Sequence, residues 1–304
     1  MHVVDCNFPM ELSLKLFTGC NLFTAALFIF MNATVTPQAL ADWDATHPSA
    51  SPVASDALAK VICRSHACCS HTRAFRVLLT PPPACPRVCA FLTRARASAA
   101  NNQTLVAVYY QVIGTMAFML ALTALVPGSM GRLLSMLALV SCMAKHITVD
   151  GLLPPPPVMG MAGITLLLCL FSVASDSESY SKWSFTLYNA ITSATFALAP
   201  QTPLRDTFAA LPADGETLAI GLLLMEVLAY FTYTLAVVTA LAPSLKGYAL
   251  GMLPGLALIY KHVVVNKSGP PAPVMWFNII TTLLLAKDAF LAAPAAEKGG
   301  KKTE

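Results

Sequence analysis

Two Lys-His dipeptides are the residues of this sequence whose types and repetition point most directly to chemistry. Lys145-His146 and Lys261-His262 lie 116 positions apart, and each comes at the expected C-terminal end of an apolar helix. An ammonium group beside an imidazole can bind an anion, such as a lipid headgroup or an acidic small molecule. Alternatively, the cations only stabilise their helix ends, by about 0.3–1 kcal/mol, because a helix C-terminus carries partial negative charge. Both interpretations stay open.

A glutamate inside an apolar segment is the second candidate for chemistry. Glu226 lies in LLLMEVLAY, and a carboxylate inside a membrane costs about 3 kcal/mol unless it is protonated or paired. Tyr230 follows at i+4, where it can supply a hydrogen bond. Glu226 can therefore bind a ligand or handle a proton, or it can serve helix packing alone. The candidate ligand-binding residues are Lys145, His146, Lys261, His262, Glu226 and Tyr230.

No known catalytic motif accompanies these residues. The sequence has no P-loop, no glycine-rich dinucleotide motif, no nucleophile elbow and no HExxH pair. Glu226 is the one clear acid inside an apolar segment, which favours a non-catalytic protein that binds lipid or holds membrane proteins together. We expect membrane lipid and other membrane proteins as partners, and no nucleic acid, cofactor or metal. The alternative is a lipid- or quinone-modifying enzyme, or a transporter, that uses Glu226 and the Lys-His pairs.

The elements that position these residues are apolar segments long enough to cross a membrane. The chain is 56% hydrophobic and 11% charged, against about 25% charged in soluble domains. Because a bilayer offers no water to the backbone, continuous apolar segments must be helices. We predict an all-α integral membrane protein with eight helices, at Leu14–Val35, Thr104–Val126, Arg132–Ile147, Val158–Ala174, Phe185–Ala199, Thr217–Ala242, Gly247–Val265 and Val274–Phe290.

The sequence matches itself, which predicts two repeats of a four-helix unit. Shifted by 116 residues, positions 123–168 match their counterparts without a gap, and twenty of the 46 residues are identical. The first helix of each repeat matches more weakly, at an offset of 168. Because each repeat has an even number of helices, the two repeats are parallel. Met10–Ala41 can also be read as a cleaved signal peptide, which would leave seven helices.

The repeats set the predicted domain boundaries. The first repeat covers residues 1–175, a cytosolic linker covers 176–184 and includes Glu178 and Lys182, and the second repeat covers 185–293. A basic tail covers 294–304. Since the two offsets differ by 52 residues (168 − 116), the first repeat carries an insertion, at about 51–100.

The insertion is rich in cysteine and arginine and has no helical periodicity. Three interpretations stay open. The Cys and His residues of SHACCSH could hold a metal, although their spacing matches no zinc pattern. The segment could be a disordered basic loop that touches anionic lipid. It could also be translated non-coding sequence that does not belong to the native protein.

The basic residues outside the helices predict the orientation of the chain in the membrane and its location in the cell. With both termini in the cytosol, and without the insertion, seven lysines and arginines face the cytosol and four face the other side. Lys301 and Lys302 resemble a dilysine retrieval signal, which predicts residence in the endoplasmic reticulum. Alternatively, they belong to a basic tail that only anchors the chain end.

Short motifs in both halves resemble the DoxX-like superfamily of four-helix membrane proteins. They are a Pro/Gly turn, a helix rich in Ala, Leu and Met that ends in His, and a Pro-rich entry to the next helix. The matching residues are Pro127, Gly131, Met136 and His146, and again Pro243, Gly247, Met252 and His262. Glu226 falls where many such proteins have a glutamate, whereas the first half has Tyr110. The resemblance implies a membrane fold but no single activity.

A weaker likeness is to the four-helix scaffold proteins of the ergosterol pathway. It is carried by TPLRDTF at Thr202–Phe208. This likeness would imply that the protein tethers sterol enzymes.

Overall fold

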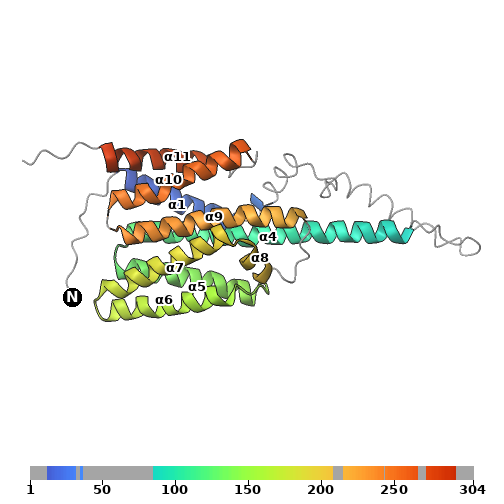
Figure 1. Ribbon diagram of the computed structural model, residues 1–304, viewed down its shortest axis with the longest axis horizontal. Helices are drawn as coiled ribbons and strands as arrows, with labels where there is room; N and C mark the ends of the chain where they lie inside the picture. The colour runs from blue at the N-terminus through green and yellow to red at the C-terminus, as the bar shows by residue number, and fades with distance from the viewer. Residues whose placement is uncertain are drawn as a thin grey trace, which may run out of the picture.

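The computed structural model describes residues 12–31, 35–36, 85–207, 215–242, 244–265 and 272–291, with the backbone alone at 85–103, 205–207 and 215–217. Within these ranges every element is a helix (Figure 1). The helices are α1 (Leu12–Phe30), α4 (Cys85–Leu125), α5 (Ser129–Thr148), α6 (Pro156–Ala174), α7 (Glu178–Leu198), α8 (Gln201–Thr207), α9 (Gly215–Ala240), α10 (Leu245–Tyr260) and α11 (Ala272–Ala286). Two π-helical turns, η2 (Lys261–Val265) and η3 (Lys287–Leu291), extend α10 and α11.

Seven helical stretches in the described residues are long and apolar enough to cross a membrane. The chain is therefore a polytopic membrane protein. The one predicted membrane helix that is not among these seven is α7. It is equally long but less apolar, because it begins with ESYSK and carries several Ser, Thr and Asn residues. Two of its buried polar side chains donate hydrogen bonds within the helix, Asn189 to the Phe185 carbonyl at 2.8 Å and Thr192 to the Tyr188 carbonyl at 2.7 Å.

The eight long helices form a closed ring in chain order. Each packs against the next one along the chain, and α11 returns to pack against α1. In addition, α4 packs along α9 across the middle of the ring, as Figure 1 shows. These two helices are the most deeply buried of the spans, with fully enclosed side chains such as Met119, Leu120 and Leu235.

Two predicted boundaries differ in the structure. The predicted linker at 176–184 is shorter, because α7 begins at Glu178 after Ser177. Glu178 and Lys182 therefore belong to a helix. The last part of the predicted insertion, residues 85–100, forms the beginning of α4, which extends beyond the bundle (Figure 1). Residues 51–84 lie outside the described residues, so the interpretation of 51–100 as an insertion stays a prediction.

The junction of α5 with α7 explains why α7 begins where it does. Arg132, only 5% exposed, donates from Nε to Ser181 Oγ at 3.0 Å. Its guanidinium also lies 3.7 Å from a Glu178 carboxylate oxygen. The Ser181 amide in turn donates to Ser172 Oγ of α6 at 2.8 Å. The polar residues at the start of α7 are thus partners for a buried arginine of another helix.

Candidate functional site

The first Lys-His pair lies at the C-terminal end of α5 and shares one carboxylate. His146 Nδ1 is 2.6 Å from Asp150 Oδ2, and Lys145 Nζ is 3.2 Å from the same oxygen. Lys145 Nζ also donates to Gln111 Oε1 of α4. The His146 side chain is buried, whereas Lys145 is exposed. Asp150 therefore holds the imidazole in place and balances the charge of the ammonium group.

A glycine turn brings Asp150 next to His146. Asp150 follows His146 at i+4, just after the end of α5. Gly151 then takes a left-handed conformation, with a φ of 66°, which glycine adopts without steric cost. The Leu152 amide donates back to the His146 carbonyl at 2.9 Å. The chain thus closes over the helix end with the carboxylate against the imidazole.

Asp150 lies outside the membrane-spanning segments, and its contacts change its acidity. Burial acts to raise the pKa of this carboxyl group. The hydrogen bonds from His146 and Lys145 outweigh burial and lower the pKa below its ordinary value. Asp150 is therefore a carboxylate at neutral pH, as an acceptor for these two donors must be.

A cysteine contacts His146 on the side opposite Asp150. Cys142 precedes His146 by one helical turn, and its Sγ is 3.4 Å from His146 Nε2. When His146 donates a hydrogen bond from Nδ1 to the Asp150 carboxylate, its Nε2 carries no proton. The lone pair of Nε2 then faces the Cys142 sulfur. A thiol, an imidazole and a carboxylate are thus arranged in sequence along the end of α5.

His146 and Cys142 line a partly open apolar cavity between α4, α5, α7 and α9, to which the chain before α6, the first turn of α6 and Pro203 of α8 also contribute. The volume of this cavity is about 100 Å³. Its wall is almost entirely hydrocarbon and ring surface, from residues that include Val112, Met116, Leu139, Pro155, Tyr188 and Leu228. Lys145 and Asp150 are not part of this wall. The cavity therefore offers an apolar interior with a few residues that carry polar groups, namely His146, Cys142, Thr192, Tyr109 and Tyr188. The charged cluster of Lys145 and Asp150 lies next to it.

The second Lys-His pair is also joined to one carboxylate, from a different place. Lys261 Nζ lies 2.6 Å from Glu226 Oε1, and His262 Nε2 lies 3.7 Å from Glu226 Oε2. The pair belongs to the π-helical turn η2, and Glu226 belongs to α9. Three of the predicted site residues, Glu226, Lys261 and His262, therefore come together. Lys261 and Glu226 form an ion pair, and their side chains are 49% and 36% exposed.

Tyr230 does not bond to Glu226. Its hydroxyl donates to Met252 Sδ of α10 at 3.2 Å. Its ring packs so closely on Gly255 that an added Cβ there would come within 2.5 Å of the hydroxyl oxygen. The described contacts of Tyr230 thus join α9 to α10.

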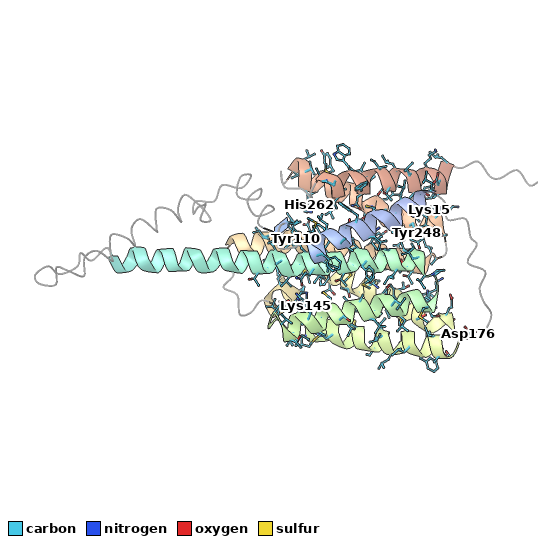
Figure 2. All side chains as sticks on the ribbon, turned by 180° about the vertical axis from the view of Figure 1, so that it is seen from behind. Lys15, Tyr110, Lys145, Asp176, Tyr248 and His262 are labelled. Atoms are coloured by element: carbon cyan, nitrogen blue, oxygen red, sulfur yellow. The ribbon has the colours of Figure 1, made fainter. Side chains whose placement is uncertain are left out.

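The two Lys-His pairs face the same end of the bundle without meeting. Figure 2 shows Lys145 and His262 at one end, with Lys15, Tyr248 and Asp176 at the other. However, α5 and α10 lie on opposite sides of the α4–α9 pair (Figure 1). Each lysine has its own carboxylate, so the charges of each pair are balanced within its own half.

The proline-rich entry to α6 leaves few amide groups for an anion. Pro155 caps the helix, and the first helical residues, Pro156 and Pro157, have no N–H group. The amides of Val158 and Met159 both donate to the Pro155 carbonyl. These groups are therefore not available to bind an anion at the beginning of α6. The corresponding entry to α11 is described only from Ala272 onward.

Sequence reasoning missed Gln111, Cys142 and Asp150. Cys142 and Asp150 flank His146 at i−4 and i+4, so helical spacing predicts both as neighbours. Gln111 lies on another helix, and nothing in the sequence pairs it with Lys145. Lys301 and Lys302, the predicted retrieval signal, lie outside the described residues.

Comparison with known protein families, curated proteins and solved structures finds no match. The likeness to the DoxX-like superfamily and the likeness to ergosterol-pathway scaffolds therefore stay predictions.

Proposed function

We propose that this protein is a non-catalytic membrane protein that binds a membrane lipid. The hydrocarbon chain of the lipid enters the cavity between α4, α5, α7 and α9, and its polar group meets the cluster of Lys145, His146 and Asp150. The observation that carries the proposal is the apolar cavity with a buried imidazole in its wall. Sites for small apolar ligands have this composition, since a few polar groups orient a ligand that is otherwise held by apolar surface.

The size of the cavity fits part of an acyl chain. An engineered apolar cavity of about 150 Å³ stays dry and binds a ligand as small as benzene. A cavity of about 100 Å³ therefore takes a few methylene groups, and the rest of the chain lies along the lipid-facing helices. Many large apolar side chains are exposed on those helices, including Leu134, Ile164 and Leu167.

The proposal includes two parallel four-helix repeats. The helix bounds support this duplication, because α5 begins 116 residues before α10 (129 + 116 = 245) and α6 begins 116 residues before α11 (156 + 116 = 272). An endoplasmic reticulum location, with both termini cytosolic, completes the proposal and rests on the sequence alone.

The contacts and position of Glu226 favour binding of a lipid over its chemical conversion. Glu226, the residue on which the enzyme or transporter alternative depends, is engaged by Lys261 and does not line the cavity. A membrane-protein scaffold would need no cavity at all. The cavity therefore argues for a bound small molecule first, with protein partners as a second possibility for the test.

Native mass spectrometry of the purified full chain tests lipid binding. We expect a co-purifying lipid that is lost in Leu139→Trp and in Met143→Trp, because both side chains line the cavity. Leu137→Trp is the matched control, since Leu137 lies on the same helix but is 43% exposed. A chain without bound lipid, or a lipid kept by both cavity variants, would refute the proposal. A stoichiometric protein in place of lipid would favour the scaffold.

A further inference from the structure

We propose that Cys142 is a site of S-acylation, at which the thiol accepts the acyl group of a long-chain acyl thioester. His146 acts as the base and Asp150 as a positioning residue. The inference rests on the proposed function, because the same cavity would hold the acyl chain.

The contacts are those that activation of a thiol requires. Cys142 Sγ is 3.4 Å from His146 Nε2, and His146 Nδ1 is 2.6 Å from Asp150 Oδ2. A nucleophile, a base and a group that orients the base make up the general arrangement for nucleophilic chemistry. The two contacts run in series and do not converge on one point, and no cluster of metal ligands occurs among the described residues.

The position of Cys142 fits an acyl donor. The thiol lines the apolar cavity, and it lies six residues, or about 9 Å, before the end of α5. A chain inserted into the cavity would therefore place its carbonyl carbon near the helix end, where Cys142 and His146 lie. The large polar part of the donor would stay outside, beside Lys145 and Asp150.

The step is balanced without another reactant. His146 Nε2 takes the proton of the Cys142 thiol, and the thiolate attacks the carbonyl carbon of the thioester. The bond from this carbon to Sγ forms, and its bond to the donor sulfur breaks. His146 then returns the proton to the departing thiolate. One thioester replaces another, and nothing is oxidised or reduced.

The second half of the chain lacks this arrangement. At the shift of 116 residues, Leu258 stands in place of Cys142 and Asn266 in place of Asp150, although His262 is kept.

The buried cysteines Cys20 and Cys169 are natural controls, since neither lines the cavity.

The test uses the full-length protein in lipid nanodiscs with palmitoyl coenzyme A as the probe. Peptide mass spectrometry should find one palmitoyl group on Cys142, released by neutral hydroxylamine, and none on Cys20 or Cys169. We expect Cys142→Ser to remove the modification. His146→Gln should slow it at least about a hundredfold, the usual range for loss of a base.

Two further comparisons separate the roles of the residues. Asp150→Asn should lower the acylation rate at saturating probe, and Asp150→Glu should restore part of this rate. Leu139→Trp should raise the half-saturating concentration, while Leu137→Trp leaves both quantities unchanged. This split distinguishes a positioning role from a general loss of structure.

The results also separate this inference from lipid binding. If the chain carries a bound lipid but Cys142 stays unmodified, S-acylation is refuted and lipid binding stands. If His146→Gln is acylated as fast as the unchanged protein, the proposed base is refuted. Absence of both lipid and acyl group would overturn the two proposals together.

Discussion

The histidines of the two Lys-His pairs meet their carboxylates in different ways. His146 has its acid one turn further along the chain, in Asp150, whereas His262 lies near Glu226 of another helix. At the position equivalent to Glu226 the first half has Tyr110, whose ring stacks on Phe28 of α1. Each Lys-His pair therefore has one carboxylate, but the two carboxylates come from different places in the fold.

This difference explains which site contacts could be predicted from sequence. The cations were placed correctly at helix ends, because a helix ending in Lys-His is visible in the apolar pattern. Asp150 could have been found from its i+4 spacing to His146. The contacts of Lys145 with Gln111 and of Lys261 with Glu226 could not, since they depend on how α4 packs on α5 and α9 on α10.

Acidity should remove the contribution of Asp150 to stability. Its pKa is lower in the folded protein than in the unfolded chain, so this contribution is present above about pH 4 and is lost as the pH falls through the folded value. Asp150→Asn should lower the free energy of unfolding by about 1–3 kcal/mol at neutral pH, since hydrogen bonds to a charged group are lost. The difference from the unchanged protein should shrink towards zero once the pH falls below the folded pKa of Asp150.

Denaturation in mixed micelles, followed by tryptophan fluorescence at several pH values, measures both quantities. Asp176→Asn is the control, because Asp176 is exposed and its replacement should change little at any pH. A difference between Asp150→Asn and the unchanged protein that persists at low pH would show that the carboxylate charge is not what stabilises the site.

The helices were predicted well in their centres and less well at their ends. Their centres follow from continuous apolar segments, which have one solution in a bilayer. Their ends depend on capping and on contacts with other helices. Apolar patterning does not indicate that α7 begins at Glu178, because its partner Arg132 lies 46 residues away along the chain. The short helix α8 and the two π-helical turns were not predicted either.

The tight turn from α4 into α5 makes Gly131 irreplaceable. A Cβ at Gly131 would lie 1.7 Å from the Val126 carbonyl oxygen, a backbone atom that cannot move aside. We expect Gly131→Ala to lower the free energy of unfolding by at least about 2 kcal/mol, as overpacking does. At the equivalent Gly247 the nearest atom would be a side-chain carbon of Leu241 at 3.0 Å, so Gly247→Ala should cost less.

Denaturation in mixed micelles also tests whether Gly131→Ala destabilises the protein more than Gly247→Ala. Gly160→Ala on α6 is the matched control, since an added Cβ there meets no atom within 4 Å. It should leave stability unchanged or raise it by up to about 1 kcal/mol, because alanine is the better helix former. Equal losses for Gly131→Ala and Gly160→Ala would contradict the account of the turn.

The closed ring of helices makes the two halves depend on each other. Among the described residues, the first half contributes α1, α4, α5 and α6, which pack as an open row, and α7, α9, α10 and α11 do the same in the second. The row closes only where α6 meets α7 and α11 meets α1, while α4 packs on α9 across the middle. The cavity also needs both halves, because α7 and α9 supply part of its wall.

Cutting the chain in the α6–α7 turn should therefore give two fragments that fold only together. Membrane helices form before they associate, so fragments 1–175 and 176–304 can each insert in the membrane. They can then pair where α6 meets α7, α11 meets α1 and α4 meets α9. We expect the co-expressed fragments to co-purify with bound lipid, and each fragment expressed alone to aggregate or be degraded. Affinity purification through a tag on one fragment, followed by size-exclusion chromatography, measures this. A stable, monodisperse single fragment would show that a half folds independently and that the ring is not what holds the molecule together.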